Sequence, residues 1–413
     1  MTDIDAVITA AFQTEWGRLV ATLIGFTGDW DLAEESVQDA FARAWQTWPR
    51  DGVPDRPGAW LLTAARHRAV DRLRRDRVGE AKLRQLVVID DVSESDSGAF
   101  DSGIEDERLQ LIFTCCHPAL AFEAQVALAL RTLVGLSTAE IARAFGVPEA
   151  TMSKRLARAK RKIRDAAIPY RVPPRYLLPE RTRAVLGVVY LLFNEGYVGT
   201  SGRDLQRPML AVEARRLAGL LVELMPDDPE ARGLNALVLL QHSRSSTRTD
   251  PTGALVPLEE QDRTRWDRAL ITAGLGELRH ASRRERLGPY QLQAMIAACH
   301  VAAPSSAETD WAKIAELYDA LLKHVPSPTV ALNRAIAIAM RSGPQAGLDI
   351  LDDLAGAGGL KHNHLLPAAR ADLLRRLGRP GAAAAAYHAA IEQTSNQAEI
   401  AYLRRRLDQL PPC

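Results

Sequence analysis

The 413-residue sequence contains only four cysteines, and none of them belongs to a Cys-x-x-Cys pair. Cys115 and Cys116 are adjacent, and the other two are Cys299 and Cys413. This usage argues against a disulfide-stabilised secreted scaffold and for a reducing compartment. We expect Cys115 and Cys116 to be core residues, because neighbouring helical side chains point in different directions and cannot readily bind one metal.

Long hydrophobic runs are also missing. The longest, Ala184–Phe193, has ten residues, whereas a membrane-spanning helix needs about 20. The N-terminal stretch carries Asp3, Asp5 and Glu15 and lacks the basic and apolar regions of a secretory signal. The sequence therefore predicts a cytoplasmic protein without a membrane segment.

Catalytic motifs are absent as well. There is no Walker G-x-x-x-x-G-K-[ST], no G-x-S-x-G and no metal-binding spacing, so we expect no enzyme, no metal and no cofactor. Because the net charge is only +1, any nucleic-acid surface must come from local segregation of charge. Alternation with a period of two is scarce and helical periodicity recurs throughout, which predicts an all-α fold.

The most informative stretch is residues 136–164, LSTAEIARAFGVPEATMSKRLARAKRKIR. Ser137 and Glu140 have the spacing of a capping box at a helix start. Gly146 suits a tight turn with positive φ, and Pro148 suits the beginning of a second helix. The pattern predicts a helix-turn-helix.

The second of these helices separates apolar from basic residues. Residues 148–165 contain seven Lys/Arg and two Asp/Glu. The expected buried stripe is Met152, Leu156, Ala159 and Ile163. Such a helix can place its N-terminal residues at base edges and its basic residues on phosphates. The alternative is a solvated basic face on an ordinary helical hairpin.

Two earlier segments carry opposite charges. In residues 31–48 we expect Asp31 to cap a helix, the acidic residues Glu34, Glu35 and Asp39 to lie on its outer side, and the apolar positions through Trp45 and Trp48 to be buried. A Pro/Gly-rich loop at 49–58 precedes a strongly basic helix at 59–77, which suits single-stranded nucleic acid. Eight acidic and no basic residues between Asp90 and Glu107 indicate a flexible acidic linker.

In this order the segments resemble an extracytoplasmic-function (group-four) sigma factor of bacterial RNA polymerase. DLAEESVQDAFARAW is similar to the polymerase clamp-binding helix, AWLLTAARHRAVDRLRR to the helix that melts and reads the minus-ten element, and residues 136–164 to the reader of the minus-thirty-five element. The resemblance implies a sigma domain two at 1–78, an acidic linker at 79–105 and a sigma domain four at 106–168.

The resemblance also implies three groups of site residues. The polymerase-binding group is Asp31, Glu34, Glu35, Asp39 and Trp45. The minus-ten group is Trp60, Arg66, His67, Asp71, Arg72 and Arg75, with the loop 51–57 capturing a flipped base. The minus-thirty-five group is Thr151, Ser153, Lys154, Arg155 and Arg158. His67 stands where the family frequently has Asn, so the preferred minus-ten base does not carry over.

The chain continues far beyond such a pair of domains. Residues 169–180 are a proline-rich connector, and 181–413 form an extension. YLLFNEGY resembles the signature of a sigma subgroup whose C-terminal extension has tetratricopeptide-like helices and is needed for activity. In its signature, Asn194, Glu195, Gly196 and Tyr197, we expect Gly196 to end a helix and Tyr197 to pack back.

A repeat is visible in the extension itself. Gly343-Pro344 and Gly378-Arg379 recur at an offset of 35, each between two apolar helical segments. A period near 34 is typical of tetratricopeptide repeats, although a generic helical bundle is the alternative. Stacked repeats form a concave surface, which we expect to dock on the sigma domains or on a regulatory protein. Residues 243–263 are predicted to be an exposed loop.

The sequence thus predicts a sigma factor that binds core RNA polymerase and promoter DNA, with a fused helical domain that regulates it. The alternative is a stand-alone helix-turn-helix transcription regulator with a helical sensor domain. Residues 31–77 argue against this alternative, since a plain regulator has no use for a strand-capturing helix. A scaffold protein whose basic helices are incidental is a third hypothesis.

Overall fold

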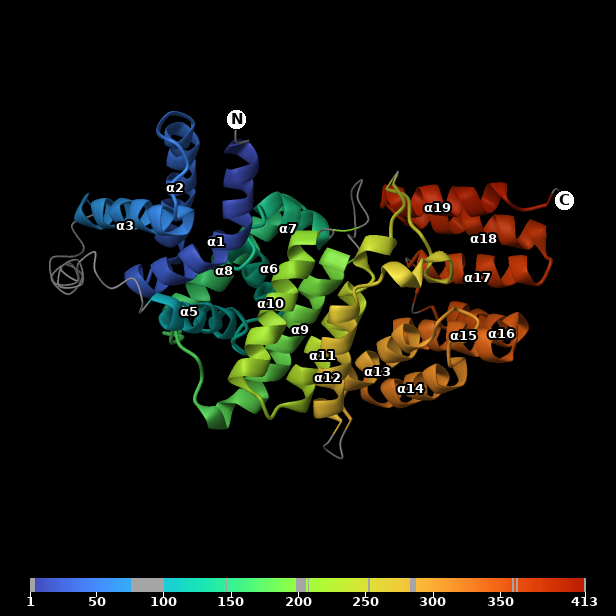
Figure 1. Ribbon diagram of the computed structural model, residues 1–413. Coiled ribbons are helices and arrows are strands. Elements are labelled where there is room, and N and C mark those ends of the chain that lie inside the picture. The colour runs from blue at the N-terminus through green and yellow to red at the C-terminus, as the bar shows by residue number, and fades with distance from the viewer. Residues whose placement is uncertain are drawn as a thin grey trace. The chain divides into compact units, whose positions relative to one another are not determined.

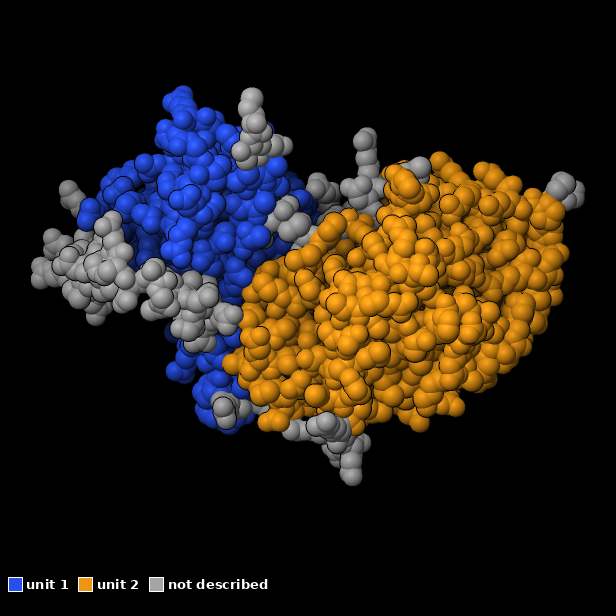
Figure 2. Space-filling view, viewed as in Figure 1, with its two compact units in different colours: residues 1–188 blue, residues 189–413 orange. Residues whose placement is uncertain are grey.

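The computed structural model describes residues 4–75, 100–145, 147–197, 206, 208–251, 253–282, 287–358, 360–361 and 363–411. Over these residues the chain is mainly helical, and it contains an isolated β-bridge between Thr249 and Leu255. It divides into two compact units, residues 1–188 and 189–413 (Figure 2). The predicted all-α fold is confirmed.

The first unit begins with three packed helices, α1 (Ile4–Thr27), α2 (Trp30–Asp51) and α3 (Pro57–Arg75) (Figure 1). Each of the three contacts the other two. Their core is built from residues at helical spacing, with Trp16, Leu23, Val37, Trp48 and Leu61 all buried. This three-helix core holds α3 with its arginines on the outside.

Two details of α2 differ from the prediction. The N-cap is Asp29 rather than Asp31, and its carboxylate accepts hydrogen bonds from the amides of Asp31 and Leu32 at 2.9 and 3.0 Å. Gly28 adopts φ +68 and ends α1 immediately before this cap, which fixes where α2 begins. Trp45 was expected in the core but is 52% exposed, because Ala44 and Trp48 already fill that side of the helix.

A second helical group follows in the same unit: α5 (Phe100–Cys115), α6 (Phe122–Thr132), α7 (Thr138–Ala144) and α8 (Glu149–Asp165). Residues 79–99 of the predicted acidic linker and the turn residue Gly146 lie outside the described residues. Helix α5 starts at Phe100, before the expected end of that linker at 105. Cys115 and Cys116 are fully buried, as predicted.

The helix-turn-helix has the predicted local structure. The Ser137 amide donates to Glu140 Oε2 at 2.8 Å, and the Glu140 amide donates back to Ser137 Oγ at 3.2 Å. In α8 the buried residues are the expected stripe of Met152, Leu156, Ala159 and Ile163. The sequence therefore predicted both the start of α7 and the buried face of α8.

Substitution Ser137→Ala removes the hydroxyl that accepts a hydrogen bond from the Glu140 amide in this capping box. We expect it to lower the free energy of unfolding by about 1 kcal/mol, the usual cost of losing a serine cap. Chemical denaturation monitored by circular dichroism measures the change. Ser137→Thr keeps the hydroxyl and serves as the control, and an equal loss in both variants would show that the hydroxyl is not the stabilising group.

The rest of the described chain is a succession of helices, most of which pack against a neighbour in sequence, while α13 packs mainly against α11. After the short turn η1 (Arg175–Leu177) come α9 (Leu178–Tyr197), α10 (Pro208–Leu224), α11 (Pro229–His242), α12 (Arg268–Ala281), α13 (Pro289–Ala302), α14 (Trp311–His324), α15 (Pro328–Ser342), α16 (Pro344–Ala357), α17 (Leu365–Arg376), α18 (Pro380–Gln393) and α19 (Gln397–Asp408). The boundary between the units falls within α9.

The helices on either side of the two repeated glycines form as predicted. Gly343 separates α15 from α16, and Gly378 separates α17 from α18. Both adopt positive φ, +98 and +68, which a residue with a Cβ rarely does. This arrangement agrees with a helical repeat, although the tetratricopeptide assignment stays a prediction. No described helix has the length and apolar character that crossing a bilayer requires.

The segment 243–263 is not the exposed loop that its composition suggested. It contains the turns η2 (Ser245–Thr247) and η3 (Leu258–Glu260) and leads into η4 (Arg263–Arg265). Thr247, Arg248 and Arg263 are each at least nine-tenths buried. Their side chains hydrogen-bond to backbone and side-chain groups of the second unit, so polar residues here are structural.

Candidate nucleic-acid and polymerase interface

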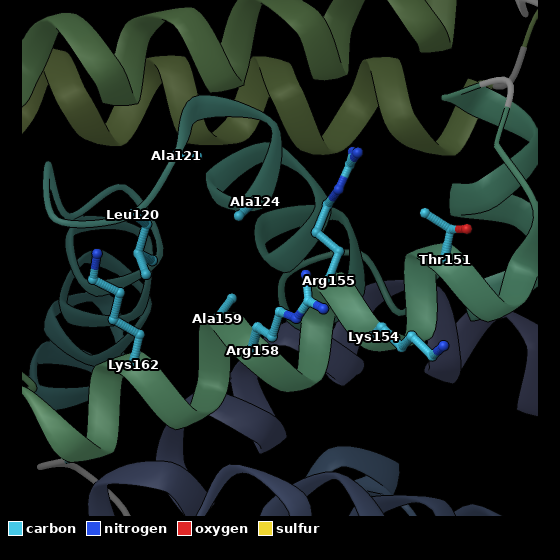
Figure 3. Close-up of a pocket in the computed structure, with 9 residues that line it drawn as sticks. All are labelled: Leu120, Ala121, Ala124, Thr151, Lys154, Arg155, Arg158, Ala159 and Lys162. Carbon is cyan, nitrogen blue, oxygen red and sulfur yellow. The ribbon is translucent and has the colours of Figure 1, made fainter.

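The basic face of α8 forms one wall of a groove of about 440 Å³ (Figure 3). Along α8 this wall consists of Thr151, Lys154, Arg155, Arg158, Ala159 and Lys162. The other wall is formed by Leu120 and Ala121, just before α6, and by Ala124 in its first turn. Four of the five residues predicted to read the minus-thirty-five element therefore line one groove. The fifth, Ser153, is exposed but does not line it.

The groove is strongly positive. Lys154, Arg158 and Lys162 are exposed, and among the described residues no carboxylate pairs with them. The guanidinium of Arg155 lies over the ring of Phe145, 5.5 Å from the ring centroid. Phe145 belongs to the turn between α7 and α8, and this cation–π contact orients the Arg155 side chain. Because the opposite side of α8 is buried, these cations all face outward. The predicted minus-thirty-five group did not include Lys162 or the opposite wall of the groove.

Helix α3 presents the residues predicted for the minus-ten element. His67, Asp71, Arg72 and Arg75 are exposed on it, whereas Arg66 and Trp60 are half-buried. The Trp60 ring packs edge-on against Trp48 with centroids 5.6 Å apart, so its position is fixed by the core of the three-helix group. Arg68, on the side nearer α2, pairs with Asp39. The helix thus carries one aromatic anchor beside a row of cations.

The acidic residues of α2 do not all share one outer face. Glu35 is exposed and Asp31 has a side chain 77% exposed, but Glu34 is only 5% exposed. The prediction that Glu34 lies on the outer side is therefore wrong. Glu34 stands three, seven, ten and fourteen positions before Val37, Phe41, Ala44 and Trp48, so helical periodicity places it in line with the buried stripe.

Two basic residues that sequence reasoning missed neutralise Glu34. Arg131 Nε, at the end of α6, lies 2.9 Å from Glu34 Oε2, and Lys160 Nζ, on α8, lies 2.7 Å from Glu34 Oε1. Lys160 also pairs with Asp31 at 2.8 Å. A buried charge needs such partners. Their separation from Glu34 along the chain leaves no local signal that could have found them.

The signature of the extension lies at the end of α9, and the helix continues through Tyr197 rather than ending at Gly196. The expectation that Gly196 ends the helix is wrong. A Cβ on Gly196 would overlap the amide nitrogen of Ala211 and lie 2.9 Å from Ala211 Cα and Leu210 C. The glycine is needed because the backbone of α10 passes against α9 at this point.

Tyr197 does pack back, onto arginines of the segment after α11. The guanidinium of Arg248 stacks 3.4 Å from the centroid of the Tyr197 ring and donates to the Tyr197 carbonyl oxygen. Arg244 Nη2 donates to the Tyr197 hydroxyl at 2.7 Å. Arg263 donates to the carbonyl oxygens of His300 and Ala303 at 2.5 and 2.7 Å. Tyr197 and these arginines therefore connect α9 with the middle of the second unit.

The second unit also contains a groove of about 450 Å³. Its apolar lining comes from α14, α15 and α17 and includes Trp311, Tyr318, Ile336, Met340, Leu365 and Leu373. Glu259, in η3, lies at its edge and pairs with Arg376 at 3.2 Å and with Arg406 at 3.3 Å. The groove is a concave, largely apolar surface that the predicted repeats offer to a partner.

Nucleophilic or metal chemistry finds no support in the described part of the chain. It holds no group of three or more His, Cys, Asp or Glu side chains that could bind a metal ion. Burial raises the pKa of the Cys115 thiol to about 12, and burial also raises that of Cys116. Both thiols are therefore protonated at neutral pH and poor nucleophiles.

Comparison with known families agrees with this geometry. Residues 12–78, which begin within α1 and include α2 and α3, match the profile of sigma-70 region 2. Residues 110–163, which end within α8, match sigma-70 region 4. Residues 181–282 match a family of unknown function, DUF6596. No solved structure matches the chain.

Related proteins are of two kinds. An uncharacterized protein of Rhizobium meliloti is 42% identical over 398 residues, 95% of this chain and 93% of the relative. The ECF RNA polymerase sigma factors SigC and SigL of Mycobacterium tuberculosis are 31% and 29% identical over 38% of this chain, which is 79% and 88% of those proteins. The chain belongs to the extracytoplasmic-function sigma factors, non-enzymatic subunits that direct transcription initiation by RNA polymerase, and it carries a C-terminal extension of unknown function.

Proposed function

We propose that the minus-thirty-five element is read by the basic groove of α8, through Thr151, Ser153, Lys154, Arg155 and Arg158. The observation that carries this proposal is the separation of faces on α8, where a fully buried apolar stripe forces every cation of the groove outward. Arginine and lysine are the side chains best suited to guanine edges in the major groove, while the remaining cations contact phosphates.

For the minus-ten element, the proposed surface is α3. Trp60, Arg66, His67, Asp71, Arg72 and Arg75 are assigned to the melted strand on the basis of the family resemblance and their place on this helix. The cations hold the backbone of the strand, and the loop before α3 captures the unstacked base. Since capture of a flipped base stabilises the melted state, this surface supplies free energy for promoter opening.

Core polymerase is proposed to bind α2. Glu35 and Trp45 are exposed there, with Trp45 the most exposed tryptophan of the helix, and Asp31 lies at the first turn. An exposed tryptophan beside carboxylates is typical of a protein-binding surface. Asp39, paired with Arg68, and Glu34, paired with Arg131 and Lys160, complete the proposed group.

The extension is proposed to regulate the sigma domains, with sigma domain two at 1–78, sigma domain four at 106–168 and the extension from 181. Its support is the resemblance of the YLLFNEGY signature together with the structural position of Gly196 and Tyr197. The repeats are proposed to dock, through the groove between α14, α15 and α17, on the sigma domains or on a regulatory protein.

Run-off transcription with purified core polymerase on a promoter library tests these assignments. The full chain and a chain ending at Arg171 are compared. We expect the full chain to initiate from a defined set of promoters and the shortened chain to lose most of that activity. If only the shortened chain initiated transcription, the extension would be an inhibitor. If neither chain bound core polymerase, the polymerase assignment would be refuted and the stand-alone regulator would take its place.

A further inference from the structure

The two groups of helices in the first unit, α1 to α3 and α5 to α8, are joined by an interface that includes the buried carboxylate of Glu34. Its carboxylate receives Arg131 from α6 on one oxygen and Lys160 from α8 on the other, at 2.9 and 2.7 Å. Lys160 also reaches Asp31, and its side chain is only 13% exposed. The two ion pairs of Glu34 are therefore enclosed within the interface, whereas the Asp31 side chain stays 77% exposed.

Backbone packing closes the same interface beside these charges. Gly17 of α1 faces Leu133, just after α6, so closely that a Cβ at residue 17 would overlap the Leu133 carbonyl oxygen and lie 3.2 Å from its carbon. Trp16 is 2% exposed, and its Nε1 donates to the Arg131 carbonyl oxygen at 3.3 Å. Gly135, at φ +80, leaves room for the Trp16 ring.

A second set of contacts lies on either side of Trp16 and Gly17 along α1. The Tyr170 hydroxyl, after α8, donates to the Ala21 carbonyl oxygen at 2.9 Å. Thr22 Oγ1 donates to Glu107 Oε2 at 2.5 Å, and Arg108 Nη2 donates to the Thr14 carbonyl oxygen at 3.0 Å. The interface thus extends over several turns of α1 and is specific in its hydrogen bonding.

This interface uses residues that the proposed polymerase contact also needs. Asp31 and Glu34 belong to the proposed polymerase-binding group, yet both are paired with basic residues of the chain itself. Glu35 and Trp45 of the same helix are exposed. Polymerase can therefore contact the exposed residues Glu35 and Trp45 in this packing. It can contact Glu34 only after the ion pairs to Arg131 and Lys160 have broken.

We propose that this packing is a closed, autoinhibited state of the two promoter-binding domains, in which Arg131 and Lys160 cover the inner part of the polymerase-binding face of α2. The proposal rests on the assignment of Asp31 and Glu34 to polymerase binding. If polymerase binds the separated domains, its apparent affinity is reduced by the fraction of molecules that are closed. Weakening the interface then raises that affinity.

Gly17→Ala is the sharpest variant, because its Cβ meets atoms of Leu133 across the interface. Alanine also favours the helical state of α1, so the three-helix group keeps its fold. Gly25→Ala is the matched control on the same helix, where the new Cβ would lie an ordinary 3.5 Å from Tyr170 Cε1. Lys160→Gln is a second opening variant, which removes the charge facing Asp31 and Glu34 without adding bulk.

Two measurements on the full chain are needed. The distance between spin labels at the exposed positions Thr63 of α3 and Asp165 of α8 reports separation, in a background with Cys299 and Cys413 replaced by serine. Titration with core polymerase gives the affinity. We expect Gly17→Ala and Lys160→Gln to lengthen the distance and to tighten polymerase binding about five- to tenfold, and Gly25→Ala to change neither.

A fourth variant separates the two possible failures. Glu35→Lys alters the proposed polymerase face outside the interface, and it should weaken polymerase binding at least tenfold without changing the label distance. If Glu35→Lys binds normally, the polymerase assignment of α2 is wrong. If it binds weakly but the opening variants gain no affinity, the polymerase assignment holds and autoinhibition is refuted. Unchanged distances in both opening variants would also refute the proposal.

Discussion

Substitution Gly196→Ala is expected to unfold or strongly destabilise the second unit. The added Cβ would overlap the amide nitrogen of Ala211 and lie 2.9 Å from two further backbone atoms of α10. Backbone atoms cannot rotate away as the end of a flexible side chain can, so α9 and α10 must separate. Overpacking of this kind costs about 1–3 kcal/mol, and more where the neighbour cannot yield. Thermal unfolding of the full chain measures the loss.

Gly219→Ala in α10 is the matched control. Nothing lies within 4 Å of a Cβ at that position, so the same chemical change meets open space. Alanine in a helix interior is more stable than glycine by about 0.5–1 kcal/mol, which predicts a small gain. If Gly196→Ala also gained stability, the close approach of α9 and α10 would be disproved. Run-off transcription with the two variants then shows whether the variant that destabilises the extension also loses transcription initiation.

Helix positions could be predicted from the sequence because they depend on local patterns. The stripe of Met152, Leu156, Ala159 and Ile163 and the Ser137–Glu140 capping box are both local, and both formed as predicted. The glycines at 343 and 378 likewise mark turns through their own φ values. The prediction was less accurate at the start of α2, where Asp29 is the N-cap, and at Gly196, which lies inside α9 against the backbone of α10.

What the sequence could not predict depends on contacts between distant residues. Glu34 looks like one of several surface carboxylates until Arg131 and Lys160 are brought to it by the packing of α6 and α8. The polar segment 243–263 looks like a loop, but Tyr197 and the carbonyl oxygens of α13 provide partners for its arginines. A polar side chain can be buried where the fold supplies hydrogen-bond or ion-pair partners, and composition does not reveal those partners.

Replacing Arg155 and Arg158 together by alanine is expected to lower initiation from a promoter with an intact minus-thirty-five element by about 100-fold. Each well-formed contact from an arginine to a base is worth about 1–3 kcal/mol of discrimination, and both side chains line the same groove. The loss should be small on a promoter whose minus-thirty-five element has been scrambled, because the contacts are already missing there. Run-off transcription on the two promoters measures the ratio.

The helix supplies its own control in Arg161 and Arg164, which are exposed on α8 but do not line the groove. Replacing this pair by alanine removes the same charge from the same helix, so long-range attraction to DNA falls equally in both double variants. We therefore expect the control pair to lower binding similarly on both promoters and to leave their ratio nearly unchanged. Equal ratios for the two pairs would mean that α8 acts only as an electrostatic anchor, and sequence reading would then have to come from another surface of the domain.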